Sequence, residues 1–342
     1  MKFGGLPRGL KAAYRGSNVA RRVKRFDGWT DRAFSEDAGA GGYDHVETVT
    51  EYYDLCNEFM VFGWGEALHF APLTPGESLT DSKIRHQRLM IAKLALQKGM
   101  TVVDVGCGIG DPMRRVAREA GVRVVGVNTS EVQLQRARSL NAEAGLDGTV
   151  DCVACDFMDM SVFEDGAFDR GYAIESTCHA PDKTRAFAEI LRVLKPGALF
   201  WGQEMCMTER FDPGDSRHLD VKQELMHGIA LKDIATMGEV DRALETAGFR
   251  IVESIDRAEG ARMPWYRPLE ARQGTPDNAW RRVQLGRTAI FGASKLAELL
   301  RIFPKGSADV VRLMDRTANA YVAGGRTGIF TPLYCFLARK PD

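Results

Sequence analysis

Apolar and polar positions in the middle of the chain alternate between two patterns. Short runs of apolar residues predict buried strands, and apolar residues three and four positions apart predict helices that cover a sheet. The predicted strands span 101–105, 122–127, 149–154, 168–174 and 198–205. The predicted helices span 111–120, 130–144 and 184–194, and Lys195-Pro196-Gly197 is expected to stop the last of them. This order predicts an α/β fold with a parallel, Rossmann-like sheet.

Two further strands are predicted, at 248–255 after a helix over 237–247, and at 330–340. They complete a seven-stranded, mostly parallel sheet whose last strand is expected to run antiparallel. The segment before the sheet is expected to form a helical cap. Two helices predicted near 280–302 and 307–322 are expected to form a helical insertion over the ligand edge of the sheet.

The expected domains follow from these elements. They are an N-terminal helical cap over 1–80, a Rossmann-like cofactor domain over 81–256, a helical substrate lid over 257–328 and the final strand within 329–342.

The first predicted strand ends in a glycine-rich turn, Asp104-Val105-Gly106-Cys107-Gly108-Ile109-Gly110. Dinucleotide enzymes use a similar turn, but they place their third glycine where Asp111 stands here. A carboxylate beside a pyrophosphate would suffer repulsion on the order of a few kcal/mol in a partly desolvated site. S-adenosylmethionine carries a sulfonium and an ammonium, which nearby acids favour. The loop therefore predicts S-adenosylmethionine rather than NAD.

Polar residues after the next two strands support this cofactor. Asn128 is placed to bind the ribose hydroxyls, with a helix cap as the alternative role. Asp156 and Phe157 supply an acceptor and a ring for the adenine, with a turn as the alternative for Asp156. The predicted cofactor-binding residues are Asp104, Gly106, Cys107, Gly108, Asn128, Gln133, Asp156, Phe157, Ile174 and Glu175.

Several further blocks make residues 45–340 resemble the sterol 24-C-methyltransferases. These blocks are Tyr52-Tyr53-Asp54-Leu55, Gly63-Trp64-Gly65 with His69-Phe70, Gly76-Glu77-Ser78, Arg85-His86, Tyr172-Ala173-Ile174-Glu175-Ser176-Thr177-Cys178-His179-Ala180-Pro181, Pro264-Trp265-Tyr266, Ala323-Gly324-Gly325 and Phe330-Thr331-Pro332. The resemblance implies that the methyl acceptor is the side-chain double bond of a sterol and that no metal is used.

Two stretches depart from the pattern of that family. Its aromatic–acid–aromatic run reads Met60-Val61-Phe62 here, and its Gly-Asp-Gly-Ile-Pro run reads Met226-His227-Gly228-Ile229-Ala230. Each change removes an acid expected near the substrate cavity. The alternative acceptors are other terpenoid or prenylated alkenes. A prenyl diphosphate among them would require clustered basic residues, and Arg85 and Arg281-Arg282 form no compact cluster in the sequence.

Methylation of an alkene sets the requirements for the catalytic residues. The double bond must be aligned with the S–CH₃ bond away from water, the resulting carbocation must be stabilised, and a base must then remove a proton. Glu175 is predicted to give electrostatic support or to contact the cofactor, and His179 to act as the base or to orient it. Tyr172 and His69 complete the predicted catalytic set, with core packing and support of the cap as their alternatives.

Aromatic residues are predicted to form the substrate wall, because their faces stabilise cations. Phe62, Trp64 and Phe70 are expected to face the carbocation. Glu204 is a second candidate acid, with a salt bridge as its alternative, and Trp265 and Tyr266 are expected to form a rigid lid segment, with plain packing as theirs.

The charge balance excludes nucleic acid as the main partner, because 46 basic residues match 46 acidic ones. The first 26 residues, however, contain eight basic residues and no acidic one. They predict a solvated tail or helix, with peripheral membrane contact or an organelle-targeting leader as alternatives. A cytoplasmic homo-oligomer with a lipid-like terpenoid or sterol substrate is expected.

The seven cysteines are odd in number and lack the spacing of a disulfide framework, which is typical of a reducing compartment. Cys152 and Cys155 lie on a predicted strand, where residues three apart face opposite sides, so no metal is expected there.

Overall fold

The computed structural model describes residues 6–33, 44–270 and 281–342. A seven-stranded sheet forms its centre, in the order β3-β2-β1-β4-β5-β7-β6. The strands are β1 (Thr101–Val105), β2 (Arg123–Asn128), β3 (Val150–Ala154), β4 (Phe168–Ile174), β5 (Leu194–Met207), β6 (Arg250–Asp256) and β7 (Phe330–Arg339). β7 runs antiparallel to both of its neighbours, and the other pairs are parallel. The predicted α/β, Rossmann-like sheet with an antiparallel last strand is confirmed.

Helices cover both faces of this sheet, and each face has its own apolar core. On one face, Met90 of α4 (Leu79–Lys93), Met113 of α5 (Asp111–Ala120) and Leu134 of α6 (Glu131–Glu143) pack on the strands. On the other face, Phe187 of α7 (Lys183–Val193) and Val240 of α9 (Met237–Thr246) do so. Successive residues of β1 alternate between the two cores, as the pleat of a strand requires.

The start of β5 differs from the prediction. Lys195-Pro196-Gly197, expected to separate helix from strand, lies inside β5, which begins directly after α7 ends at Val193. The physical reason is an irregularity in strand pairing, because the register between β4 and β5 jumps from Leu194 to Leu199. A proline without an N–H is tolerated where the ladder is interrupted in this way.

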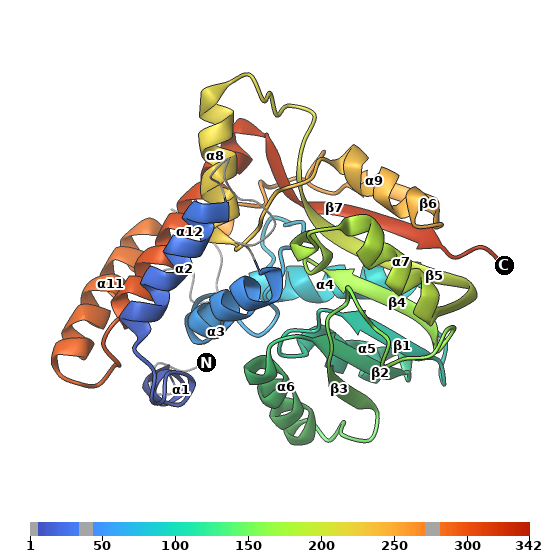
Figure 1. Ribbon diagram of the computed structural model, residues 1–342, viewed down its shortest axis with the longest axis horizontal. Helices are drawn as coiled ribbons and strands as arrows, with labels where there is room; N and C mark the ends of the chain where they lie inside the picture. The colour runs from blue at the N-terminus through green and yellow to red at the C-terminus, as the bar shows by residue number, and fades with distance from the viewer. Residues whose placement is uncertain (1–5, 34–43, 271–280) are drawn as a thin grey trace.

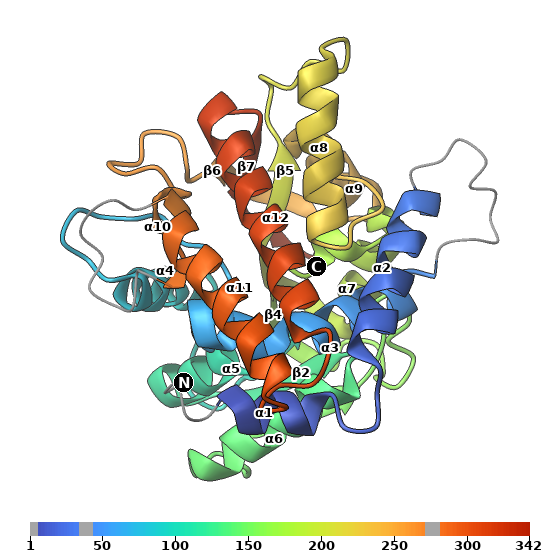
Figure 2. The same ribbon diagram turned by 90° about the vertical axis from the view of Figure 1, so that its left-hand side faces the viewer.

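A second, purely helical layer stands at one end of the sheet (Figure 1). It contains α1 (Leu6–Ala13), α2 (Val19–Ala33), α3 (His45–Trp64), α8 (Ser216–Gly228), α10 (Arg267–Glu270), α11 (Gln284–Leu299) and α12 (Ser307–Thr327). Leu10, Phe26 and Leu55 from the first three helices share one apolar core with Phe303 and Val310. The segments expected as cap and lid therefore pack together, and Figure 2 shows α2, α8, α11 and α12 side by side.

The helix α8 of this layer, like the short α10, was not predicted individually from the sequence. It lies against α12, where the Thr317 hydroxyl donates to the carbonyl oxygen of Gly228 at 2.9 Å. In the described ranges, no helix is both long enough and apolar enough to cross a bilayer.

Candidate active site

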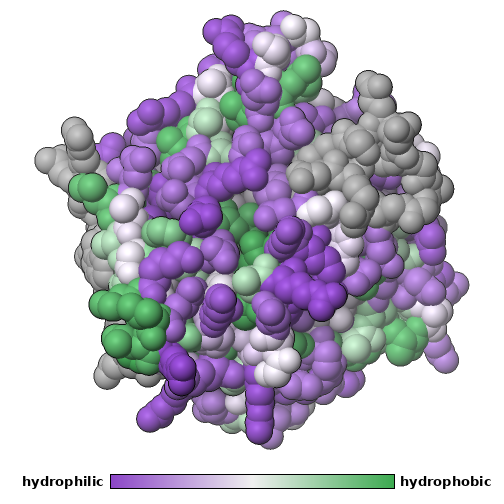
Figure 3. All heavy atoms as spheres, turned by 60° about the vertical axis from the view of Figure 1, so that its left-hand side comes forward, coloured by the Kyte–Doolittle hydropathy of each residue, from purple (hydrophilic) through white to green (hydrophobic). Residues whose placement is uncertain are grey.

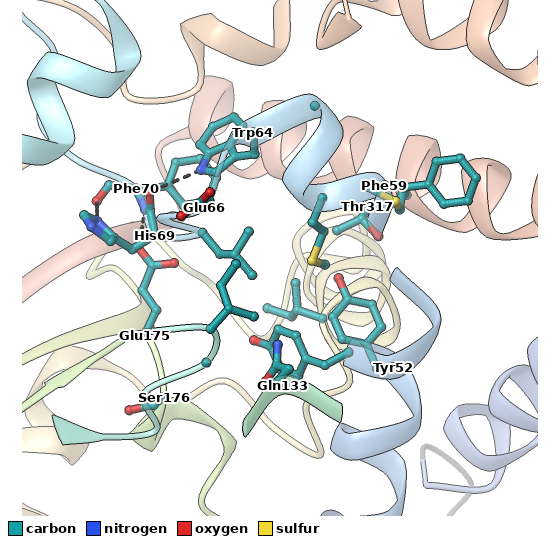
Figure 4. Close-up of a pocket in the computed structure, with 18 of the residues that line it drawn as sticks. Tyr52, Phe59, Trp64, Glu66, His69, Phe70, Gln133, Glu175, Ser176 and Thr317 are labelled. Carbon is teal, nitrogen blue, oxygen red and sulfur yellow. Dashed lines mark hydrogen bonds between the residues drawn. The ribbon is translucent and has the colours of Figure 1, made fainter. Parts of the chain in front are cut away.

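A cavity lies between the carboxyl ends of β1, β2 and β4 and the helical layer. Its sheet side is formed by the turns that follow these strands, which is the usual ligand edge of such sheets. Its helical side is largely apolar and includes Tyr52, Phe59, Met60, Val311 and Met314. In Figure 4, Glu175 and Tyr52 stand on opposite sides of this space and Gln133 lies at its base.

The glycine turn after β1 forms the sheet-side floor. Gly106 has a φ of 87°, and a Cβ there would meet Cβ of Ser176 at 2.3 Å, so only glycine fits. A Cβ on Gly108 would meet nothing within 4 Å, which leaves open space beside the loop for a ligand. The turn therefore packs against Ser176 at Gly106 and leaves space for a ligand at Gly108.

Asp104 supplies an acid at this turn. Its Oδ2 atom is buried and makes no hydrogen bond of standard geometry among the described residues, although the Tyr172 hydroxyl lies close enough to affect its pKa. Burial raises the pKa of Asp104 to about 8. An unsatisfied buried carboxylate beside an open glycine fits a positively charged ligand, because a cation would supply the missing partner. The buried carboxyl group and the open glycine turn therefore fit S-adenosylmethionine.

Most of the predicted cofactor-binding residues meet in this cavity. Those that line it are Asp104, Gly106, Cys107, Gly108, Asn128, Gln133, Phe157, Ile174 and Glu175. Asn128 donates to Oε1 of Gln133 at 2.8 Å, so the two amides form one polar edge. Asp156 does not line the cavity. It accepts the backbone N–H of Met158 at 2.9 Å and shapes the turn that carries Phe157.

Glu175 follows β4 in a left-handed conformation with a φ of 52°, which is unusual for a residue with a side chain. Its Oε1 atom accepts the backbone N–H of Phe70 at 2.7 Å and Nε2 of Gln203 at 2.6 Å. Oε1 of Gln203 lies 2.7 Å from Nε2 of His86. Burial raises the pKa of Glu175 to about 8. A buried network from β5 and α4 therefore fixes this carboxyl group at the cavity.

His179 stands four residues further on, at the end of a 3₁₀ turn over Thr177–His179. Both Glu175 and His179 line the cavity. Nε2 of His179 lies 3.1 Å from the hydroxyl oxygen of Tyr53 on α3. Burial, and to a smaller extent the charge of Lys183, lowers the pKa of His179 to about 3. The ring is therefore neutral at physiological pH and hydrogen-bonded to a phenol.

His69 also lines the cavity, but both of its ring nitrogens have partners. Nδ1 lies 2.7 Å from the carbonyl oxygen of Phe70, and Nε2 lies 2.9 Å from Nε2 of Gln87. Nδ1 must then carry the proton and Nε2 must accept from the amide. This arrangement favours the supporting role of His69 over that of a base.

The loop that carries these residues begins where Gly65, with a φ of 100°, ends α3. The Lys83 ammonium holds the loop by donating to the carbonyl oxygens of Trp64 at 2.8 Å and Ala67 at 2.5 Å. Indole N–H of Trp64 donates to the carbonyl oxygen of His69 at 3.2 Å (Figure 4). The Gly-Trp-Gly segment is thus held rigidly against the cavity.

Phe70 is the centre of an aromatic cluster at this end of the cavity. Its ring centroid lies 5.0 Å from Trp64, 5.2 Å from Trp265 and 5.0 Å from Tyr321. Phe62, Trp64, Phe70 and Tyr321 line the cavity, whereas Trp265 stands behind Phe70. Three aromatic residues of the predicted wall therefore reach the space, and Tyr321 of α12 joins them.

Three other predicted residues lie off the cavity. Tyr172 is fully buried in the sheet core. The carboxyl group of Glu204 accepts hydrogen bonds from the Thr177 hydroxyl and, at 3.1 Å, from the Lys183 ammonium. Tyr266 covers Gly325, where a Cβ would meet its ring at 2.1 Å. The alternatives given for them, core packing and an ion pair, describe these positions.

The two positions at which this chain lacks an acid of the family also lie off the cavity. Val61 is buried but does not line the cavity. His227 is also buried away from it, with Nε2 3.1 Å from Asp27. The two missing acids therefore do not alter the cavity wall directly, whereas Met60, which stands in place of the first aromatic residue of the family's aromatic–acid–aromatic run, lines the cavity.

Three arginines reach the cavity, a grouping that the sequence did not indicate. The Arg281 guanidinium lies 3.9 Å over the ring of Phe62 and donates to its carbonyl oxygen. Arg282 donates to the carbonyl oxygen of Gly63 at 3.3 Å, and Arg287 pairs with Asp315. Protein acceptors therefore already engage all three side chains.

Sequence comparisons match two family models to the chain. A methyltransferase domain covers residues 103–202, and a sterol methyltransferase C-terminal domain covers 278–342. A cycloartenol-C-24-methyltransferase of Arabidopsis thaliana is 42% identical over 87% of this chain and 88% of its own. A sterol 24-C-methyltransferase of Eremothecium gossypii is 37% identical over 95% and 88%.

Solved structures share the fold at lower identity. A cyclopropane synthase of Mycobacterium tuberculosis has a TM-score of 0.68 and 20% identity, covering 87% of this chain and 99% of that chain. A geranyl diphosphate C-methyltransferase of Streptomyces coelicolor has a TM-score of 0.61 and 19% identity, covering 89% and 100%.

Proposed function

The chain belongs to the sterol 24-C-methyltransferase family, and from this premise we propose that it methylates the side-chain double bond of a sterol. One observation carries the proposal: a single cavity joins an acidic glycine turn to an aromatic wall and a neutral histidine–tyrosine pair. S-adenosylmethionine, when bound, supplies an electrophilic methyl group on a positively charged sulfur. The enzyme is an S-adenosylmethionine-dependent methyltransferase.

The sheet edge is proposed to hold the cofactor. Asp104 would bind a positively charged group of the ligand, since its Oδ2 atom makes no hydrogen bond of standard geometry with a described residue. Gly106 and Gly108 would let the backbone approach closely, and Asn128 with Gln133 would bind the ribose hydroxyls. Phe157 would pack on the adenine, and Asp156 would act indirectly by shaping the turn beneath Phe157.

The aromatic cluster and Glu175 are proposed to stabilise the carbocation. Electrons of the substrate double bond would form the new bond to the methyl carbon as the S–CH₃ bond breaks and its electron pair stays on sulfur, which leaves a positive charge on the side chain of the substrate. Trp64, Phe70 and Tyr321 all line the cavity, where their rings would attract a carbocation through cation–π interactions. The carboxyl group of Glu175 is held at the same wall by Phe70. Its ionised form would add electrostatic stabilisation.

Tyr53 and His179 are proposed to remove the proton that restores an alkene. A carbocation makes its neighbouring C–H bond strongly acidic, so a weak base suffices. The phenol oxygen of Tyr53 would accept that proton while its own hydrogen passes to Nε2 of His179 across 3.1 Å. His179 is ready to accept it because burial keeps the ring neutral. His69 would position the wall rather than take the proton.

A neutral lipid fits the cavity better than a prenyl diphosphate. The helical side of the cavity is largely apolar, and its three guanidinium groups are engaged by Phe62, Gly63 and Asp315. A diphosphate would have to displace these partners and bring its own charge out of water. Residues 257–328 are proposed to act as the lid over such a lipid, with Trp265 and Tyr266 as its rigid support.

The test pairs substrates that differ only in the acceptor bond. The purified protein is incubated with labelled S-adenosylmethionine and either cycloartenol or the same sterol with a saturated side chain. We expect label only in the unsaturated sterol, with the mass of one CH₂ unit added in mass spectrometry, since a methyl group is gained and a proton is lost. Equal labelling of the saturated sterol, or none of any sterol while a linear terpene is labelled, would contradict the proposal.

A carboxylate pair tests the role of Glu175. Above about pH 8, where the carboxyl group is ionised, Glu175→Gln should lower kcat by about 10²-fold or more, because a preorganised charge is lost from the transition state. Glu66→Gln is the control, since Glu66 lines the same cavity but pairs with Arg114 at 3.0 Å. Wild-type turnover by the Glu175 variant would remove this residue from the proposed site.

A further inference from the structure

The C-terminal end of α11 carries an exposed apolar surface. Leu296, Leu299, Leu300 and Ile302 are 57%, 79%, 59% and 43% exposed. We call these four residues the apolar patch, and the green area at the lower left of Figure 3 shows it. Four large aliphatic side chains within seven positions are more than scattered surface residues, so they indicate an interaction site.

Basic residues lie beside the apolar patch, on the side of Leu299. Lys11, Lys295, Arg301 and Lys305 border a shallow hollow whose apolar members are Leu299, Phe303 and Pro304. Lys11 belongs to α1, which passes below the end of α11 in Figure 2. No described carboxylate lies within ion-pair distance of Lys11, Arg301 or Lys305. Arg8 and Arg15 add two more exposed cations on and beside α1.

The one carboxylate of the hollow is already engaged. Glu298 accepts the backbone N–H groups of Gly306 at 3.2 Å and Ala308 at 2.6 Å. It therefore caps the start of α12 instead of neutralising the rim. Lys295 is the only rim cation with nearby described acids, Glu298 at 3.9 Å and Asp309 at 3.5 Å. The surface combines exposed leucines with net positive charge.

We propose that the apolar patch and its basic rim, formed by α11 and α1, are the surface on which the protein docks to an anionic phospholipid bilayer. Leucines enter the headgroup region of a membrane while lysine and arginine bind anionic headgroups at its border. A second copy is a poorer partner, because a symmetric contact would bring two basic rims together. Among the described residues, acids stand beside the rim only at Lys295, so Lys11, Arg301 and Lys305 would meet their counterparts without an ion-pair partner.

The position of α11 connects this surface with the cavity. The same helix lines the cavity through Arg287 and Ile290, one to three turns before the apolar patch. A lipid substrate that leaves the bilayer would therefore meet α11 along its path. This delivery step rests on the proposed function, whereas docking itself does not.

Vesicle flotation tests the docking. The full-length protein is mixed with phosphatidylcholine vesicles that contain or lack phosphatidylserine. We expect binding to the anionic vesicles, weakened by added salt, and little binding to the neutral ones. Leu296→Ser/Leu299→Ser/Leu300→Ser should weaken binding by about tenfold or more, since each leucine loses its apolar transfer energy. Lys11→Glu/Lys305→Glu should lower binding to the anionic vesicles only.

Two other exposed valines provide a matched control. Val162 and Val252 are 61% and 54% exposed on other parts of the surface, so Val162→Ser/Val252→Ser should bind as the wild type does. Circular dichroism and S-adenosylmethionine binding should be unchanged in all variants. Equal vesicle binding by the leucine variant and wild type would overturn the proposal. So would conversion of a dimer to a monomer by that variant without any change in vesicle binding.

Turnover separates docking from catalysis. With sterol embedded in anionic vesicles, the leucine variant should be slower than wild type, and in detergent the two should be equal. Equal rates in vesicles would overturn the delivery step. If the wild type bound vesicles but methylated no sterol in either medium, the proposed function would fail while docking stood.

Discussion

Asp104 and Glu175 are buried acids at the cavity whose pKa values burial raises to about 8. A bound cation favours the ionised form of Asp104, so below about pH 8 binding must release a proton. The affinity for S-adenosylmethionine should therefore fall by up to about tenfold per pH unit as the pH drops below 8. Calorimetric titration over this range measures the slope.

Asp104→Asn isolates this contribution. The variant should bind S-adenosylmethionine about 2–3 kcal/mol more weakly at about pH 8 because a charged partner is lost. Its affinity should also lose most of the pH dependence. A variant that binds as tightly as wild type, with the same slope, would show that another group holds the cation.

Tyr53→Phe tests the proton acceptor. Removing the hydroxyl that lies 3.1 Å from His179 should lower kcat by about 10²-fold or more and leave cofactor affinity unchanged. Tyr52→Phe is the control, because Tyr52 lines the same cavity and leaves the Tyr53–His179 contact intact. The two variants should also differ in product, since a carbocation that is not deprotonated is captured by water as an alcohol. Equal rates and products would exclude Tyr53.

For single residues, the sequence was sufficient to predict those site residues that belong to one continuous motif. Glu175 and Asp104 follow strands, and strand ends can be read from the chain. The partners could not be read in the same way, because Gln203 meets Glu175 from a neighbouring strand and Tyr53 meets His179 from 126 positions away. Such contacts depend on strand register and helix rotation, which no local pattern encodes.

Among the elements, the strands β5 and β7 pack closely at Gly202. Gly202 pairs with Phe336 across the two strands, and a Cβ on Gly202 would stand 2.0 Å from that ring. Gly202→Ala should lower the free energy of unfolding by about 1–3 kcal/mol, because Phe336 also packs on Phe187 and Phe200. Urea unfolding measures this change.

Gly148→Ala is the matched control, since a Cβ there would meet nothing within 4 Å. It should be neutral within about 0.5 kcal/mol. A neutral Gly202→Ala variant would mean that the ring can move aside without loss.

The strands and helices of the sheet were predictable because buried strands and amphipathic helices leave regular patterns. The start of β5 was not, since Lys195-Pro196-Gly197 reads as a break until the interrupted pairing with β4 is seen. α8 was missed because few of its residues are buried, and its main support is the side of α12.

For the whole molecule, five buried groups set the pH dependence of stability without ligand. Burial lowers the pKa of His69, His86 and His179 to about 3. From about pH 4.5 to 6.5 these three histidines bind three protons in the unfolded chain and none in the folded chain, whereas the folded chain holds two protons on Asp104 and Glu175. The unfolded chain therefore binds one proton more than the folded chain, so the free energy of unfolding rises with pH. Between about pH 6.5 and 8 only the folded chain keeps two protons, so stability falls with pH.

Stability should therefore peak near about pH 6.5 and then fall by up to about 2.7 kcal/mol per pH unit. Urea unfolding at a series of pH values tests this, and Asp104→Asn should roughly halve the fall above the peak. A stability that keeps rising toward pH 8 would contradict the assignment of protons to these two acids. A homo-oligomer remains a prediction at this scale.

The apolar core of the helical layer has a consequence for biosynthesis. Leu10 and Phe26 emerge from the ribosome early, but Phe303 and Val310, which cover them, are nearly three hundred positions later. At about 5–20 residues per second this leaves roughly 15–60 s in which α1 and α2 have no α12 to pack against. Nascent chains should therefore recruit chaperones through these first helices until translation is nearly complete.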